Sequence, residues 1–168
     1  ETITRKLTNK KGVDVVFEFL PWSGIPDVAT SAEVVERAGR PNGGIYLDVW
    51  HYFRGSSSLD QLVAVDPGLI RAVALCDAAP PVGDPVEDTT RRRLLPGEGE
   101  FDLVGLLTAL REFGVEASMG VEILSEQQAA MHPVEAARAS FDAAQRVLAS
   151  AGYEVTTPRK EGGVHLAI

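Results

Sequence analysis

The sequence predicts an α/β fold made of parallel strand–helix repeats. Four short runs are apolar and rich in β-branched residues, as expected of strands buried on both faces; they are residues 13–20, 44–50, 69–76 and 118–124. Amphipathic helical patterns lie between and after these runs. Strands that alternate with helices form a parallel sheet with right-handed crossovers, which is either an open doubly wound sheet or part of a barrel.

Two short helices are predicted from their start signals. Thr30 and Glu33 have the spacing of a capping box, in which each side chain bonds the backbone N–H of the other's position, and they predict a helix through Ala38. Ser58 opens a second pattern of this kind, which predicts a helix through Val65.

Two further helices are predicted from their apolar faces. Residues 102–113 place leucines three and four positions apart, and Gly114 follows as a stop signal. The last helix is predicted to begin near Pro133, which suits a first helical position, and to end at Gly152. Its expected apolar face consists of Val134, Ala137, Phe141, Ala144 and Leu148.

The order of these elements predicts one domain. We expect residues 1–152 to form four strand–helix units and residues 153–168, which lack periodicity, to form a C-terminal tail. The first twelve residues are polar and are expected to be the remnant of a preceding helix.

Composition limits the partners. The net charge of −8 argues against nucleic acid, because binding to phosphates requires a basic surface, although the charge equally serves solubility. No apolar run is long enough to cross a membrane, and no signal peptide is recognised. The single cysteine, Cys76, excludes an internal disulfide and a cysteine zinc cluster. A cytoplasmic protein without membrane partners is therefore expected.

Acidic residues stand near the carboxyl ends of three predicted strands. They are Glu18, Asp48 and Glu122, and strand alternation places them on one side of the sheet. Three converging carboxylates repel one another unless a cation is bound or their pKa values rise. A divalent metal is predicted, Mg²⁺ or Mn²⁺, because both prefer oxygen ligands. The alternative is that each acid bonds a loop amide.

Two other features are candidate substrate contacts. His51 follows Asp48 by three residues, where it can contact a substrate or orient the metal site, or be an ordinary exposed loop histidine. The segment 91–102 contains three arginines and a Leu-Pro-Gly turn, which can present an arginine to a substrate oxygen or phosphate. Its alternative is a solvated basic run before Asp102, a helix N-cap.

Five strings together resemble the sugar phosphate isomerase/epimerase family with a xylose isomerase-like barrel. They are Glu18 within Phe-Glu-Phe-Leu-Pro, Leu-Asp48-Val-Trp-His51, Leu-Cys76-Asp77-Ala, Arg93-Leu-Leu-Pro-Gly-Glu-Gly-Glu-Phe-Asp102 and Val-Glu122-Ile. The match extends from about Val13 to Leu148. It implies the carboxyl-terminal half of a (β/α)₈ barrel, strands five to eight.

The resemblance also implies a site. Glu18, Asp48 and Glu122 would hold the metal, while His51 and Arg93 would lie near a small sugar or sugar-phosphate substrate. Glu18 and Glu122 would act as the catalytic pair, moving a proton through an enediolate. Carboxylates close to a C–H group next to a carbonyl can perform this step.

Two departures from the family pattern stand out. The family often has a histidine ligand on the third of these strands, where this sequence has Ala74. The motifs also belong to half of a barrel that usually needs about 250 residues. A half-barrel exposes two strand edges, so we expect pairing of two halves in a homo-oligomer.

Three functions follow from these features. The leading one is a metal-dependent sugar (phosphate) isomerase or epimerase. The alternative is a non-catalytic or truncated barrel domain that serves assembly or ligand binding, which Ala74 favours. An endonuclease barrel is a third, but it requires many histidine ligands and a basic groove, and the chain has three histidines and is acidic.

Overall fold

The computed structural model of the chain describes residues 14–154. Four strands form one sheet in the order β1-β2-β3-β6, and every neighbouring pair is parallel. The strands are β1 (Val15–Glu18), β2 (Gly43–Asp48), β3 (Ile70–Leu75) and β6 (Ser118–Val121). The predicted parallel strand–helix repeat is confirmed.

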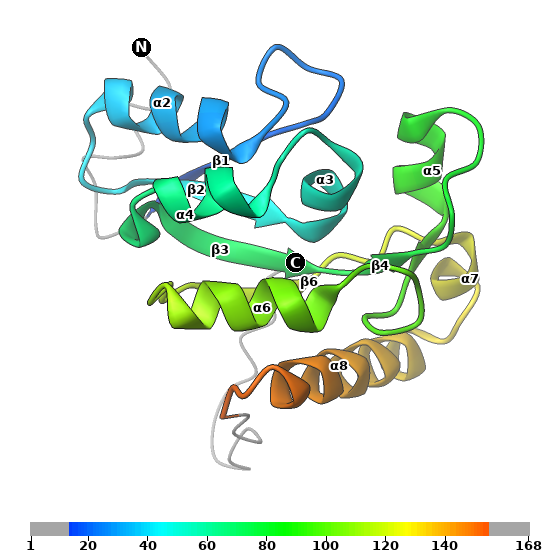
Figure 1. Cartoon of the computed structure of the whole chain (residues 1–168). Coiled ribbons are helices and arrows are strands. Elements are labelled where there is room, and N and C mark those ends of the chain that lie inside the picture. Colours follow the sequence, from blue (N-terminus) through cyan, green and yellow to red (C-terminus); the bar gives the residue numbers. More distant parts are fainter. Residues whose placement is uncertain (1–13, 155–168) are drawn as a thin grey trace.

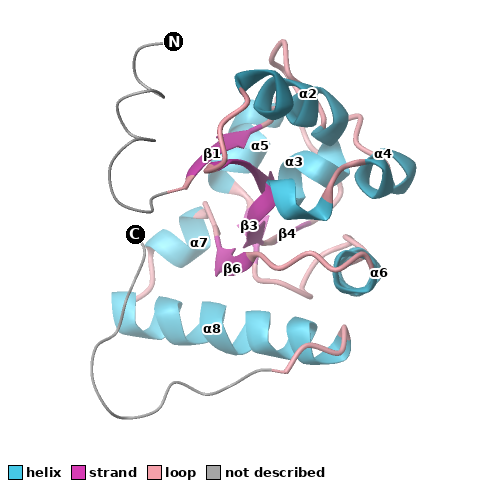
Figure 2. Cartoon of the chain, turned by 90° about the vertical axis from the view of Figure 1, so that its left-hand side faces the viewer, coloured by secondary structure: helices cyan, strands magenta, loops and turns pink. Residues whose placement is uncertain are grey.

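Four helices return the chain between and after these strands. They are α2 (Val28–Ala38), α4 (Leu59–Ala64), α6 (Leu103–Glu112) and α8 (Pro133–Ser150). In Figure 1, α2 and α4 lie on one side of the strands and α6 and α8 below them. Figure 2, which turns the molecule, shows the four helices arranged in an arc around the strands. Such an arc is the arrangement of helices outside a (β/α)₈ barrel.

The core fills the space between the sheet and this arc. Ile45, Leu47, Val73 and Leu75 have at most 1% of their surface exposed and alternate with residues of the opposite face. On that opposite face Val16 is 39% exposed. Within residues 14–154 the sheet does not close, because β1 pairs only with β2 and β6 only with β3. The described chain is therefore an incomplete barrel.

Shorter elements fill the connections after the strands. They are α3 (Val49–Arg54), the 3₁₀ helix η1 (Pro67–Leu69), α5 (Pro85–Arg91), α7 (Glu126–Ala129) and a two-stranded antiparallel hairpin of β4 (Asp77–Ala78) with β5 (Arg93–Leu94). The sequence predicted none of them as separate elements, because each is too short to carry a periodic apolar face.

Several predicted boundaries were wrong, among them the end of the fourth strand, which was expected at Leu124 and lies at Val121. The second strand was expected to reach Trp50, but it ends at Asp48, whose Oδ1 accepts the backbone N–H of Trp50 at 2.7 Å and caps α3. The helix expected from Thr30 begins at Val28 instead, because Asp27 is its N-cap and accepts the N–H of Thr30 at 2.8 Å. The carboxylate of Asp27 therefore caps the helix in place of the expected capping box of Thr30 and Glu33. The capping box at Ser58 is confirmed.

The buried face of α8 also differs from the expected one. Phe141 is 43% exposed and Val134 is 59% exposed, although both were assigned to the apolar face. Of the expected face, Ala144 is buried, and the helix also buries Ser140, Ala143 and Val147. Small side chains let α8 approach the rest of the fold closely, whereas counting apolar residues favours the bulky ones. The predicted start at Pro133 is confirmed.

Some expectations concern residues that the structure does not describe. The helix remnant predicted for the first twelve residues lies outside residues 14–154, as does nearly all of the predicted tail, so the boundary at residue 152 stays a prediction. Among the described helices, none has the length and apolar character needed to cross a membrane.

Candidate functional site

The three predicted acids stand at one end of the sheet. Glu18 and Asp48 are the last residues of β1 and β2, and Glu122 follows β6 directly. Register pairs Asp48 with Ala74 and Ala74 with Gly120, so these positions share the inner face. The N–H of Glu122 bonds the carbonyl of Leu75 at 3.1 Å and continues this register beyond β6. Parallel pairing thus gathers acids that are far apart in sequence.

Arg93 lies among these acids and is 2% exposed. Its Nη1 atom is 2.6 Å from Oδ2 of the buried Asp48 and 4.0 Å from Oε2 of Glu122. The same nitrogen donates to the backbone carbonyl of Glu122 at 3.2 Å. Burial lowers the pKa of Arg93, but the charge of Asp48, its hydrogen bond and the charges of Cys76 and Glu122 together outweigh burial, and the pKa rises. The guanidinium thus joins the ends of β2 and β6 by charge.

Thr89 on α5 fixes the other side of the guanidinium. The Nε atom of Arg93 donates to the carbonyl of Thr89 at 2.9 Å, and Nη2 donates to its Oγ1 at 2.8 Å. Thr89 is itself 3% exposed. A planar guanidinium held on two sides cannot swing away. No sequence pattern pointed to Thr89, because its contact with Arg93 depends on how α5 and β5 pack against each other.

His51 projects from α3 toward Glu18 and Asp48. Its Nε2 atom is 3.5 Å from Oε1 of Glu18 and 3.8 Å from Oδ2 of Asp48, and the side chain is 4% exposed. Burial and then the charge of Arg93 lower the pKa of His51 to about 4. The imidazole is therefore neutral at pH 7. The alternative of an exposed loop histidine was wrong.

Glu18 and Tyr46 complete the inner face. Burial, followed by the charges of Asp48 and Glu122, raises the pKa of Glu18 to about 7. The hydroxyl of Tyr46 donates to Oε2 of Glu122 at 3.5 Å, and burial raises the pKa of Tyr46 to about 12. Tyr46 and Asp48 are two positions apart on β2, so strand alternation places them on the same face. The contact of Tyr46 with Glu122 depends on the two crossovers that lead from β2 through β3 to β6.

One group of donors can surround a cation. Glu18, Asp48 and His51 each offer a ligand atom, and these atoms lie within 4.8 Å of one another. Two carboxylates with a neutral imidazole suit a divalent ion, so these residues fit the predicted metal. Ala74 supplies no donor. Glu122 stands outside this group, and its assignment as a metal ligand stays a prediction.

The loop that carries Arg93 is held by Asp77. One oxygen of Asp77 accepts the N–H of Gly97 at 3.0 Å and the other that of Phe101 at 3.0 Å. Asp77 thus shapes the loop. Arg91 and Arg92 are exposed and Asp102 caps α6, as the basic-run alternative expected, but Arg93 is buried and does not fit it.

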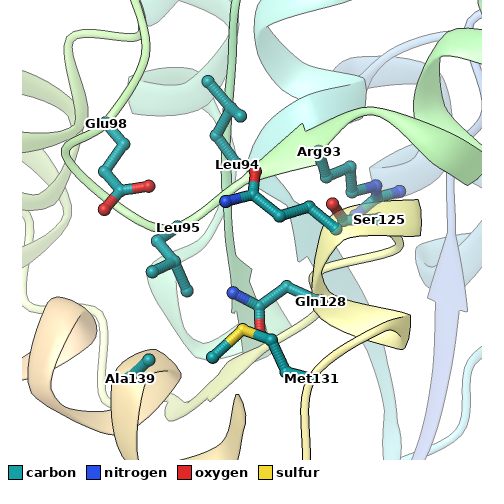
Figure 3. Close-up of a pocket in the computed structure, with 9 residues that line it drawn as sticks. Arg93, Leu94, Leu95, Glu98, Ser125, Gln128, Met131 and Ala139 are labelled. Carbon is teal, nitrogen blue, oxygen red and sulfur yellow. The ribbon is translucent and has the colours of Figure 1, made fainter.

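A cavity of about 150 Å³ lies on another side of Arg93. Figure 3 shows Gln128, Met131 and Leu95 around it. Its full lining consists of Arg93, Leu94, Leu95, Glu98, Ser125, Gln127, Gln128, Met131 and Ala139. Neither the three acids nor His51 line it, so it is separate from the cation-sized group.

Comparison with known proteins agrees with the fold. Residues 3–148 match the family described as xylose isomerase-like TIM barrel. An inosose isomerase of Halalkalibacterium halodurans is 28% identical over 140 residues, which are 82% of this chain and 49% of that protein. A 3-dehydroshikimate dehydratase of Pseudomonas aeruginosa is 30% identical over 121 residues, 69% of this chain and 18% of that protein.

A solved structure extends this likeness to three dimensions. The IOLI protein, crystallised with a zinc atom, superposes with a TM-score of 0.77 and 24% identity and covers 86% of this chain and 52% of its own. The chain thus spans about half the length of the inosose isomerase and of the IOLI protein that it matches. Half the length of these proteins agrees with a sheet of four strands that does not close into a barrel within residues 14–154.

Proposed function

Because the chain belongs to the xylose isomerase-like TIM barrel family, we propose that it carries the proton-transfer site of a metal-dependent isomerase or epimerase. The proposed substrate is a small sugar or a ketone derived from a polyol. The observation that supports it best is the meeting of Glu18, Asp48, His51 and Glu122 at the ends of three strands, beside the buried Arg93.

Glu18, Asp48 and His51 are proposed to hold the cation. When bound, a divalent cation polarises a carbonyl and lowers the pKa of the neighbouring C–H group. Mn²⁺ and Mg²⁺ suit the carboxylates, and the imidazole extends the choice to Zn²⁺, which the IOLI structure contains. The three donors leave further positions for substrate oxygens.

Glu122 is proposed to remove the proton and Glu18 to return one. Glu122 receives a hydrogen bond from Tyr46 and lies 4.0 Å from Arg93, so its carboxyl group is held in position beside the cation group, where a base is required. Arg93 is proposed to lie beside the substrate and to hold Asp48 and Glu122 in position, because its Nη1 already donates to both residues. Isomerases and dehydratases both use removal of a proton from carbon, which fits the relatives' names.

Deuterium exchange tests this function. The full chain is incubated in D₂O with ketoses, including D-fructose and an inosose, with Mn²⁺ or with EDTA, and NMR follows the protons next to the carbonyl. We expect exchange only with Mn²⁺, and a loss of at least about a hundredfold in Glu122→Gln. Glu126→Gln, at an exposed position on α7, is the matched control. Exchange that survives both EDTA and Glu122→Gln would reject the proposal.

A non-catalytic barrel domain is the second candidate. Ala74, buried beside Asp48 where the resemblance implied a histidine, favours it because one expected ligand is missing. Such a domain would bind a ligand or a partner without proton exchange. Absence of both metal binding and exchange in the isolated chain would favour this candidate.

We also propose that a second four-strand unit closes the barrel, and that another copy supplies it for the isolated chain. The free sides of β1 and β6 and the exposed inner face support the pairing. Light scattering after gel filtration is expected to give twice the mass of the chain, which is 18.0 kDa. A well-folded monomer at all concentrations would contradict it.

A further inference from the structure

Trp22 lies beside the proposed cation group without a place in the roles described above. Its ring centroid is 5.4 Å from that of His51, with the two planes at 82°, and 6.1 Å from that of Trp50. Trp50 is 1% exposed, whereas Trp22 is 42% exposed. The exposed indole of Trp22 thus lies next to the buried imidazole of His51.

The position of Trp22 is fixed by a tight turn after β1. The N–H of Ser23 bonds the carbonyl of Leu20 at 2.9 Å, and the N–H of Leu20 bonds the carbonyl of Ile25 at 3.1 Å. Pro21 restricts the turn further because its ring fixes the backbone angle φ. The backbone that carries the indole is thus shaped before any ligand binds, which lowers the entropic cost of binding.

Gly55 at the end of α3 keeps this turn close to His51. A Cβ atom at Gly55 would lie 3.2 Å from Cγ of Pro21 and 2.6 Å from the carbonyl oxygen of His51. Only glycine permits this approach. The contact ties the turn that carries Trp22 to the helix that carries His51, so the two side chains keep a constant relation.

The charges beside Trp22 select the ligand class. Glu18, Asp48 and Glu122 supply three carboxyl groups, and Arg93 is the guanidinium among them, already bonded to Asp48. Even with a divalent cation bound, the three carboxyl groups leave no surplus of positive charge to attract a phosphate group. These surroundings suit a molecule with hydroxyl groups on one side and C–H groups on another, because carboxylates accept from hydroxyls while an indole packs against C–H surface.

We infer that Trp22 is a substrate-binding residue that packs against the C–H face of an uncharged cyclic polyol or sugar whose oxygens meet the acids. This inference rests on the proposed function and names its substrate class. The inference makes the exposed indole a contact for the ligand, and it excludes a sugar phosphate as the preferred substrate.

Binding of myo-inositol, a cyclic polyol without a carbonyl, tests the inference apart from catalysis. The chain contains two tryptophans, so Trp22→Phe leaves only the emission of Trp50 and isolates the signal of Trp22. Calorimetry with Mn²⁺ present measures affinity for the full chain, Trp22→Phe, Trp22→Ala and Phe113→Ala. Phe113 is also 42% exposed but ends α6, and it serves as the control.

We expect myo-inositol to shift the emission of the full chain but not that of Trp22→Phe. Affinity should fall about tenfold in Trp22→Ala and less in Trp22→Phe, with Phe113→Ala unchanged. In exchange assays Trp22→Ala should raise KM and leave kcat nearly constant. Inositol phosphate should bind more weakly than myo-inositol.

Two results would overturn the inference. One is affinity for myo-inositol that is the same with and without the Trp22 indole, and the other is the absence of any binding. Neither result depends on exchange. Trp22-dependent binding without deuterium exchange would reject the proposed reaction and keep the inference. Deuterium exchange with the same KM and kcat in Trp22→Ala would support the proposed reaction and reject the inference.

Discussion

The Nη1 atom of Arg93 lies 2.6 Å from Oδ2 of Asp48, and both side chains are almost entirely buried. These residues are 45 positions apart in the chain. Their contact joins the end of β2 to the loop after β3, so it stabilises the fold as well as the site. Removing either charge leaves the other buried without its partner.

Replacing Arg93 by methionine should therefore destabilise the chain strongly. We expect the free energy of unfolding to fall by about 3 kcal/mol, because Asp48 becomes an uncompensated buried charge. Urea denaturation followed by circular dichroism measures this. The control is Arg91→Met, which removes an exposed guanidinium paired with Glu126 and should cost less than about 1 kcal/mol. Equal losses in the two variants would refute the structural role of Arg93.

Gly99 gives a second prediction, about the loop that carries Arg93. A Cβ atom there would meet Oδ1 of Asp77 and the carbonyl oxygen of Ala78, each at 2.3 Å. Gly99→Ala should thus push the loop away from Asp77 and cost about 2 kcal/mol. Gly24→Ala, where a Cβ atom meets nothing within 4 Å, should be nearly neutral. Thermal unfolding of both variants checks this contrast.

The raised pKa of Glu18 gives a third prediction, for the metal-free chain. Because the folded-state pKa of about 7 exceeds the ordinary value of 4.5, the folded state binds more protons between these values. The contribution of Glu18 to stability should therefore fall as the pH rises from about 5 to 8. Asp48, Glu122 and Arg93 supply the charges that Glu18 faces.

Glu18→Gln removes this titration. In EDTA the variant should be more stable than the parent at pH 8, by about 1 kcal/mol after allowance for solvent screening, and should lose this advantage near pH 5. Urea unfolding at both pH values measures the difference. Burial of His51, whose pKa is lowered, acts in the opposite sense as the pH falls, and it is common to both proteins. A constant difference between the two proteins would contradict the prediction.

The strand–helix order was readable from the sequence because the four strands and two of the helices carry strong apolar patterns, while the other two helices carry start signals. The acids were also readable, since Glu18, Asp48 and Glu122 each stand where a buried run ends. Parallel pairing then brings the carboxyl ends of the strands, and the acids on them, to the same edge of the sheet. This part of the site follows from local patterns and one topological rule.

Other parts of the site depend on contacts of short elements that carry no periodic pattern. Arg93 was noticed as one of three adjacent arginines, but its burial requires Thr89 on α5, a helix too short to show a periodic face. His51 was expected just beyond a strand, whereas capping by Asp48 turns it onto α3 and toward Glu18. The exposed position of Trp22 follows from a turn whose packing on Gly55 has no local signature.

Metal titration tests the central claim, that Glu18, Asp48 and His51 form one cation site, most directly. Calorimetry of the EDTA-treated chain with Mn²⁺ or Zn²⁺ should give one ion per chain. His51→Ala should weaken binding by at least tenfold, because it removes one of three protein donors, while His132→Ala, which changes only the N-cap of α8, should bind like the parent. Binding that is absent in the parent, or equal in parent and His51→Ala, would contradict the account.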